Sequence, residues 1–227
     1  MRRPMSSEDV RTAFENAGCI VRDGHFVYAS GKHGDTYLNK DIVLSDPRRA
    51  EHFGESIAIK LEEALSGRPI EAVVGAAMSG IKMSHLVANH LWKPERPVIS
   101  IYAEDGDPHR GEDPSQLYLH RGFELAVRGR TVVVAEDIVN RASTSTRLMQ
   151  LITAAGGEVV AIGAIWNRGS ITALMQPNAR HKLVPIVSLH DEELAAWTRV
   201  DCPLCAQNVP ISTLGHGPNF LKKRDPV

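Results

Sequence analysis

The sequence lacks the features that mark membrane, secreted or disulfide-stabilised proteins. Its 227 residues include three cysteines, an odd number that suits a reducing cytoplasm better than a disulfide framework. No apolar run approaches the roughly 20 residues needed to cross a bilayer. The basic stretch over residues 1–5 leads into polar residues, so no secretory apolar segment follows. We therefore expect a cytoplasmic protein with no membrane partner.

The sequence also has no excess of charge of either sign. Lys and Arg number 26 against 27 Asp and Glu, which gives a net charge of −1. A duplex-binding protein usually carries a basic excess, so nucleic acid is not an expected partner. The chain has no Gly-x-x-x-x-Gly-Lys-Ser/Thr motif, which disfavours a P-loop nucleotidase. What remains is an ordinary globular composition, 43% hydrophobic and 23% charged.

Apolar, β-branched runs recur along the chain and alternate with helical patterns. The runs cover residues 72–74, 98–102, 132–135, 159–165 and 183–189. Most are almost continuously apolar, as is typical of parallel strands covered on both faces. Helices are predicted from Pro47 to a stop at Gly67, over residues 81–91, and from the hydroxyls at 143–146 to Gly156. This alternation predicts an α/β fold with a central, mostly parallel sheet flanked by helices.

Two terminal segments and one internal segment fall outside the alternation. The first 45 residues precede the first apolar run, and residues 201–227 are rich in Pro, Gly and Cys; both read as an appended subdomain and a tail. Residues 103–121 are polar and contain Gly106, Pro108, Gly111 and Pro114. A loop of that length inside a compact domain is typical of a lid or a disordered segment.

The run over residues 131–139 ends in two adjacent carboxylates, Glu136 and Asp137, and is followed by Asn140, Arg141 and several hydroxyl residues. In open α/β sheets, ligands bind outside the carboxyl ends of the strands. The hydroxyls and the N–H groups of a starting helix suit a phosphate group. The carboxylates suit ribose hydroxyls or Mg²⁺. The plain alternative is a strand that ends in surface acids before a Ser/Thr helix cap.

This strand end resembles the phosphoribosyl pyrophosphate (PRPP) signature of the type I phosphoribosyltransferases, most closely those of the orotate type. Other segments resemble the family in the same order. They are a substrate-binding hood (24–27, 30–32 and 35–38), a pyrophosphate loop (73–81), the entry to the signature strand (120–123), a segment whose arginine meets orotate (165–168) and a Cys-Pro-Leu-Cys ending (202–205).

The resemblance implies a type I phosphoribosyltransferase-like fold with a hood segment at 1–45, a core at 46–200 and a tail at 201–227 that contributes to the hood. It implies a glycosyltransferase of pyrimidine nucleotide synthesis that moves a phosphoribosyl group from PRPP to orotate, or to an orotate-like base, and releases pyrophosphate. It further implies Mg²⁺ as cofactor and a homodimer.

The same resemblance assigns a role to individual residues. Glu136 and Asp137 would be catalytic and hold the ribose, with Asp137 also a candidate Mg²⁺ ligand. The remaining roles are phosphate binding (Asn140, Arg141, Ala142, Ser143 and Thr144), the pyrophosphate loop (Ala77, Met78, Ser79 and Gly80) and base binding (Tyr37, Leu38 and Arg168). For two of these the plain alternatives stay open, since Tyr37 could fill the core of the hood and Arg168 could form a surface salt bridge.

The chain departs from the family pattern in places that serve PRPP. Asn140-Arg141-Ala142-Ser143-Thr144 has no glycine where the family has two, and residues 103–121 contain no lysine. Glycine permits positive φ and close approach of the backbone to a phosphate. These differences favour a second hypothesis, a weak or inactive protein of the same fold that binds a nucleotide or PRPP as a sensor or accessory module.

Cys202 and Cys205 form a single Cys-x-x-Cys pair. A structural zinc site needs four ligands, and the candidates for completing one are Cys19, His181, His190 and His216. The pair is therefore interpreted as structural or incidental rather than metal-binding. Three other histidines, His25, His33 and His109, fall in expected loops; one of them could assist binding, but they are interpreted as solvated, as lone loop histidines usually are.

Overall fold

The chain forms two compact units, each built from two stretches of sequence. The computed structural model describes residues 3–28, 30–178 and 182–214. The first unit comprises residues 1–10 and 47–192. The second comprises residues 11–46 and 193–227. No helix in the described ranges is both long and apolar enough to traverse a lipid bilayer.

The first unit is built on a seven-stranded sheet, counted over the described residues, with the order β10-β11-β9-β8-β5-β6-β7. The strands are β5 (Ala72–Ala76), β6 (Ile99–Asp105), β7 (Leu117–Tyr118), β8 (Thr131–Val139), β9 (Glu158–Asn167), β10 (Ala173–Met175) and β11 (Leu183–Asp191). The inner strands β11, β9, β8, β5 and β6 are parallel, whereas β10 and β7 pair antiparallel at the two edges. All five predicted strands and the mostly parallel sheet are confirmed.

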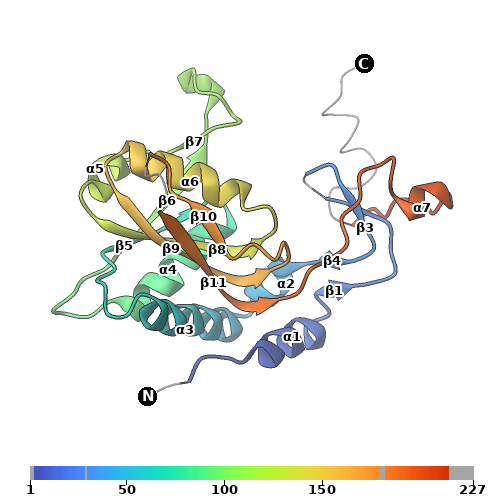
Figure 1. Ribbon diagram of the computed structural model, residues 1–227, viewed down its shortest axis with the longest axis horizontal. Helices are drawn as coiled ribbons and strands as arrows, with labels where there is room; N and C mark the ends of the chain where they lie inside the picture. Colours follow the sequence, from blue (N-terminus) through green and yellow to red (C-terminus); the bar gives the residue numbers. More distant parts are fainter. Residues whose placement is uncertain (1–2, 29, 179–181, 215–227) are drawn as a thin grey trace. The chain divides into compact units, whose positions relative to one another are not determined.

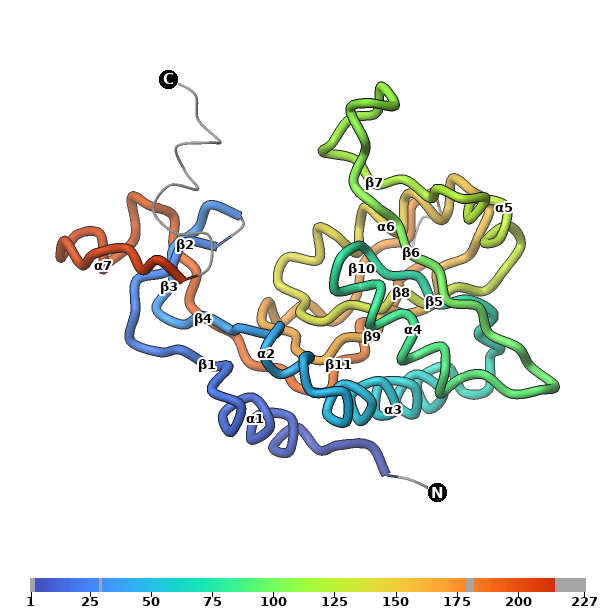
Figure 2. The backbone as a smooth tube through the Cα atoms, turned by 180° about the vertical axis from the view of Figure 1, so that it is seen from behind, coloured from blue at the N-terminus to red at the C-terminus, as the bar shows by residue number. Residues whose placement is uncertain are grey.

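Helices cover both faces of this sheet. On one face α3 (Pro47–Ala64) and α4 (Ser79–Leu91) pack against each other and against the strands. The other face carries α6 (Ser143–Ala154) and the short α5 (Phe123–Val127). Figures 1 and 2 show the two helix pairs on opposite sides of the sheet. The three helices predicted from capping and spacing, α3, α4 and α6, are confirmed.

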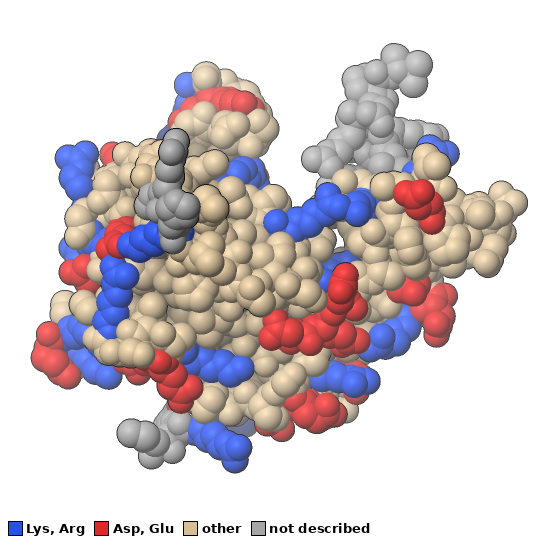
Figure 3. Space-filling model, viewed as in Figure 1, with Lys and Arg blue, Asp and Glu red and all other residues tan. Residues whose placement is uncertain are grey.

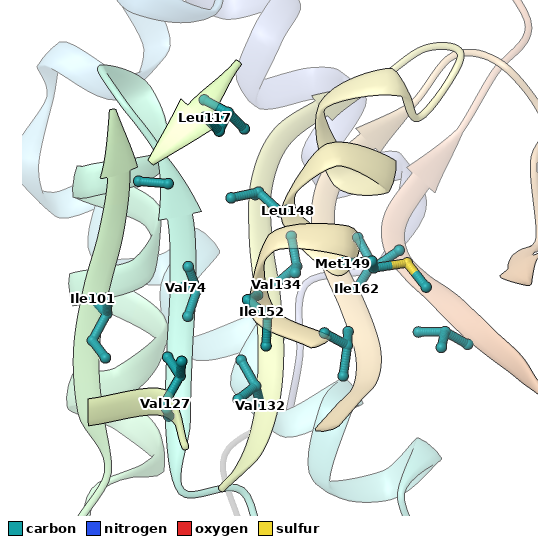
Figure 4. Close-up of a cluster of buried hydrophobic side chains, with 14 of the residues drawn as sticks. Val74, Ile101, Leu117, Val127, Val132, Val134, Leu148, Met149, Ile152 and Ile162 are labelled. Atoms are coloured by element: carbon teal, nitrogen blue, oxygen red, sulfur yellow. The ribbon is translucent and has the colours of Figure 1, made fainter. Parts of the chain in front are cut away.

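A buried apolar cluster lies between the sheet and α6 (Figure 4). Val132 and Val134 of β8 belong to it, and so do Leu148 and Ile152 of α6. Because side chains alternate along a strand, Val133 points to the opposite face, where it is also fully buried. Burial on both faces explains why the strand is continuously apolar until Glu136.

The expectation of an irregular loop over residues 103–121 is wrong in part. β6 extends to Asp105, and β7 pairs with it through Glu104–Tyr118 and Asp105–Leu117. A 3-10 turn, η1 (Pro108–Arg110), lies between them. The Arg147 guanidinium of α6 donates to the Ser115 carbonyl at 2.9 Å. The segment is therefore a β-hairpin arm, seen above β7 in Figure 1.

The second unit has short elements joined by backbone hydrogen bonds. α1 (Ser7–Asn16) leads into it from the first unit, and its other elements are β1 (Ile20–Val21), β2 (Phe26–Val27), β3 (His33–Gly34), β4 (Tyr37–Leu38), α2 (Lys40–Ser45) and α7 (Pro203–Ala206). β1 pairs with β4, and β2 pairs with β3. The N–H and carbonyl of His33 bond to Trp197, and the Ser212 N–H donates to the His25 carbonyl. The two stretches of sequence are thereby joined.

Candidate functional site

The order of the parallel strands marks where a ligand should bind. In chain order they are β5, β6, β8, β9 and β11, but in space they run β11-β9-β8-β5-β6. From β5 the chain first moves to β6 on one side and then crosses to β8 on the other side. The strand order therefore reverses between β5 and β8. In doubly wound folds the crevice outside the carboxyl ends of the strands at this point is the ligand site. The loops after β5 and β8 flank it.

The loop after β8 forms a pocket of about 90 Å³. Its lining includes all five residues predicted to bind phosphate, together with Glu136 (Asn140, Arg141, Ala142, Ser143 and Thr144). Ala142 lies in the left-handed region, with φ of +53°, and is almost fully buried. Arg141 is exposed at the rim. The chain thus makes the positive-φ turn with alanine where the family pattern has glycine.

The first turn of α6 supplies hydrogen-bond donors to this pocket. Ala142 is the N-cap and no side chain caps the helix, which speaks against the plain alternative of a Ser/Thr helix cap. The first N–H groups of a helix have no partner within the helix, and the N-terminus carries a partial positive charge. Ser143 and Thr144 therefore present N–H groups and hydroxyls to the pocket, an arrangement that suits an anion.

The two carboxylates at the end of β8 face opposite sides of the sheet. Glu136 shares the α6 face with Val132 and Val134, and its Oε1 accepts a hydrogen bond from Ser145 Oγ at 2.8 Å. Asp137 points toward the other face by strand alternation and is only 5% exposed. The carboxylates therefore cannot act as a pair on one atom. Sequence reasoning did not assign the role of Ser145, although its place in the first helical turn was a usable signal.

The loop after β5 is a tight turn with no room for side chains at two positions. A Cβ on Gly75 would lie 2.0 Å from the Gly80 carbonyl oxygen, so only glycine fits there. The Ala77–Met78 peptide is cis, and the Ala77 N–H donates to the Ala103 carbonyl at 2.8 Å. Of the predicted pyrophosphate-loop residues, Ala77 and Met78 lie between β5 and α4, whereas Ser79 and Gly80 begin α4. The Met78 side chain is 83% exposed.

The predicted base-binding residues belong to different units. In the first unit Arg168 follows β9, is 8% exposed, and donates its backbone N–H to the Val139 carbonyl at 2.8 Å. Arg168 is therefore too buried for a surface salt bridge. In the second unit Tyr37 stacks on Phe26 with ring centroids 5.7 Å apart, and Leu38 is buried. The contacts of Tyr37 and Leu38 within their unit are those of core residues.

The acidic residues of the arm are largely paired with basic ones. Glu104 forms an ion pair with Arg121, and this hydrogen bond raises the pKa of the Arg121 guanidinium. Glu112 lies 3.4 Å from His120 Nε2. On the face drawn in Figure 3, basic and acidic side chains of the described residues are interspersed. These pairs offset part of the local negative field of the arm without changing its formal net charge.

Comparison with known proteins places these features in context. No protein-family model matches the chain. The chain is 30% identical over 207 residues to an orotate phosphoribosyltransferase of Caldanaerobacter subterraneus subsp. tengcongensis, which covers 91% of this chain and 96% of the relative. It is 31% identical over 211 residues to an orotate phosphoribosyltransferase of Phenylobacterium zucineum, which covers 93% of this chain and 97% of the relative.

Solved structures show the same fold at lower sequence identity. The orotate phosphoribosyltransferase of Aeropyrum pernix aligns with a TM-score of 0.58 and 17% identity, covering 80% of this chain and 93% of that one. An adenine phosphoribosyltransferase of Thermoanaerobacter pseudethanolicus aligns with a TM-score of 0.55 and 17% identity, covering 82% and 99%. The predicted type I phosphoribosyltransferase-like fold is thereby confirmed.

Proposed function

Because the chain belongs to the orotate phosphoribosyltransferase family, we propose that it transfers the phosphoribosyl group of PRPP to orotate and releases pyrophosphate. The observation that carries the proposal is the pocket between Glu136 and the first turn of α6, at the strand reversal where a doubly wound fold binds its ligand. The relatives give no support to the non-catalytic alternative.

In this proposal the 5′-phosphate binds at residues 140–144. The N–H groups and hydroxyls of Ser143 and Thr144 donate to the phosphate oxygens, and Arg141 at the rim adds a charge-assisted bond. Glu136, oriented by Ser145, accepts from the ribose hydroxyls. Asp137 contacts the ribose from the side nearer α4, the helix that packs on the other face of β8.

The leaving group departs toward the loop after β5. Backbone donors over residues 78–80 stabilise the pyrophosphate, since the Ala77 N–H already donates to the Ala103 carbonyl. The transition state carries positive charge on the ribose that carboxylates can offset. The arm over residues 103–121 would exclude water that otherwise hydrolyses the activated sugar.

Mg²⁺ fits this site as a companion of PRPP. The ion is usually held by one or two carboxylates together with substrate phosphates and keeps several waters. Glu136, which lines the pocket, fits such an ion better than Asp137, which is 5% exposed and accepts from the Ile138 N–H. When bound with PRPP, the ion neutralises charge on the leaving pyrophosphate.

Base recognition is assigned to Arg168, whose guanidinium suits the orotate carboxylate, and to Tyr37 and Leu38 of the proposed hood. A homodimer is proposed by analogy with the family.

The direct test is to incubate the full chain with PRPP, Mg²⁺ and a panel of bases and to measure pyrophosphate release. We expect release with orotate and little with adenine. The variant Arg141→Gln should raise the KM for PRPP by roughly 10-fold to 100-fold, which corresponds to the loss of one charge-assisted bond. The matched control is Arg128→Gln, an exposed arginine at the end of α5, which should leave KM unchanged.

Two outcomes would overturn the proposal. One is the absence of pyrophosphate release with every base. The other is calorimetric binding of PRPP without turnover, which would favour the sensor or accessory role.

A further inference from the structure

Four side chains of the second unit converge on one point, apart from the pocket after β8. They are His25, His33, Cys202 and Cys205, and one ligand atom from each lies within 4.8 Å of all the others. His25, His33 and Cys202 are buried, at 2%, 0% and 2% exposure, and Cys205 is partly buried. The interpretation of His25 and His33 as solvated loop residues is therefore wrong.

The distances fit four ligands of one tetrahedral ion. His25 Nε2 lies 3.7 Å from Cys202 Sγ and 3.6 Å from Cys205 Sγ, and His33 Nδ1 lies 3.4 Å from Cys205 Sγ. Zinc bonds of about 2.3 Å to sulfur and about 2.0–2.1 Å to nitrogen place the two atoms about 3.5 Å apart at the tetrahedral angle. The observed spacings agree with that value.

One distance is shorter than a filled site requires. His25 Nε2 and His33 Nδ1 are 2.7 Å apart, whereas two nitrogens on one tetrahedral zinc are separated by about 3.3 Å. The imidazole rings would therefore separate by roughly half an ångström when the ion binds. A shift of that size needs side-chain rotation and no change of backbone path.

The hydrogen bonding of His25 leaves its inner nitrogen suited to a metal. His25 Nδ1 lies 2.7 Å from the Val209 carbonyl oxygen. A carbonyl only accepts, so Nδ1 carries the hydrogen and Nε2 directs a lone pair toward the two sulfurs. Metal-bound histidines are typically oriented by such an outer hydrogen bond. His33 Nε2, by contrast, has no hydrogen-bond partner among the described residues.

The chemistry of the ligand set selects the ion. Thiolate and imidazole favour zinc, whereas Mg²⁺ and Ca²⁺ favour oxygen ligands. Zn²⁺ displaces a proton from each of the two thiols, so an ion held by two thiolates and two neutral imidazoles has no net charge. A neutral site suits burial, because an unpaired buried charge is costly. Four protein ligands leave no position open for substrate, which is typical of a structural site.

We propose that His25, His33, Cys202 and Cys205 bind one structural zinc ion that ties the β2–β3 hairpin to the segment around α7. His25 and Cys202 are 177 residues apart in sequence, so the ion closes the second unit across its two stretches. Of the completing ligands considered from sequence, Cys19 and His190 lie outside the cluster, whereas His181 and His216 fall outside the described residues. This inference does not depend on the reaction catalysed by the first unit.

The first measurement is the metal content of the full-length protein, purified without chelator and again after incubation with Zn²⁺ and gel filtration. We expect one zinc ion per chain. The variant Cys205→Ser should bring the zinc content close to zero, and the control Cys19→Ala, which changes a buried cysteine of the same unit outside the cluster, should retain it. Retention of one zinc ion by Cys205→Ser would contradict the assignment.

A second measurement avoids variants that fail to fold. Cobalt is exchanged into the wild-type protein, where two thiolate ligands give sulfur-to-cobalt charge-transfer absorption and tetrahedral geometry gives intense visible bands. Alkylation of Cys202 and Cys205, followed by mass spectrometry, should be slow in the zinc-loaded protein and fast after chelator is added. A Cys202–Cys205 disulfide in the purified protein, or free thiols that fail to bind added zinc or cobalt, would overturn the proposal.

Discussion

Different interactions stabilise the interior of each of the two units. The first unit has a sheet of long strands whose apolar side chains are buried beneath helices on both faces. In the second unit the described strands are two residues long, and isolated hairpins of that kind are marginally stable in water. Small folds that cannot bury enough apolar surface are usually stabilised by a metal or a disulfide. Apolar burial beneath helices therefore stabilises the first unit, and we expect the proposed zinc ion to add a cross-link on which the second unit depends.

The largest expected effect is the selective unfolding of the second unit. Removal of the proposed zinc by a strong chelator should abolish amide-exchange protection at His33 and Trp197, whose backbones bond to each other. Protection in β8 and β9 should persist because their burial does not depend on the ion. Hydrogen exchange with mass spectrometry measures both regions in one sample. Equal loss of protection in the two units would end the distinction between them.

The next effect concerns the apolar core of the first unit. Leu148 is fully buried in the cluster beneath α6, and Leu148→Ala should lower the free energy of unfolding by about 2–5 kcal/mol. The zinc content should not change. The control Leu125→Ala removes a side chain that is 61% exposed and should cost less than about 0.5 kcal/mol. Urea denaturation followed by circular dichroism is the measurement, and a similar cost for both variants would refute this account of the core.

A smaller effect, on kcat/KM, is expected when the hydrogen bond between α6 and Glu136 is removed. Ser145→Ala removes the hydroxyl that orients Glu136, and kcat/KM should fall roughly 10-fold, as expected for one hydrogen bond to a charged group. The control Ser84→Ala removes a buried hydroxyl of α4 that donates to the Ile81 carbonyl. It should cost similar stability with no loss of activity. Steady-state kinetics of both variants would contradict the orienting role if kcat/KM fell equally.

The smallest effect is expected at the surface of the first unit. Hydrogen bonds from Lys182 and then Arg68 lower the pKa of Glu158 below its ordinary value of 4.5. A lowered folded-state pKa stabilises the protein above that ordinary value, and the contribution is lost as the pH falls through the folded-state pKa. Because the side chain is 40% exposed, Glu158→Gln should cost less than about 1 kcal/mol at neutral pH.

The cost of Glu158→Gln should disappear at a pH well below 4.5, the ordinary pKa of the carboxyl group. Urea denaturation of the wild-type protein and the variant at the two pH values measures the difference. A cost that persists in acid would show that packing, and not charge, accounts for it.

The sequence predicts the first unit well and the second poorly, for a physical reason. Residues 132–135 are apolar without interruption because β8 is buried on both faces, and such a run is visible in sequence. The acidic residues and hydroxyls that follow this run are also contiguous in the sequence, so the pocket that they form could be predicted. In the second unit, by contrast, the described strands are two residues long, and two residues make too short a pattern to stand out in a sequence.

The proposed metal cluster was not predicted from the sequence because its ligands come from two distant stretches of the chain. A Cys-x-x-Cys pair near one end of the chain and two histidines eight residues apart near the other are each common. No local rule connects them, because the two stretches meet through long-range contacts such as the pairing of His33 with Trp197 and of Ser212 with His25. The orientation of Glu136 by Ser145 is of the same kind, since helix and strand positions were predicted but not their contact.

The division of the second unit between two distant stretches has a consequence for biosynthesis. The ribosome releases residues 11–46 early, but their partners in the segment from residue 193 onward emerge only after β11 of the first unit is complete. Because domains generally fold as units during synthesis, the sheet can assemble before Cys202 and Cys205, the partners of the hairpin of His25 and His33, have been synthesised. Nascent chains that stall before Cys202 would therefore carry a folded sheet and an unfinished N-terminal segment.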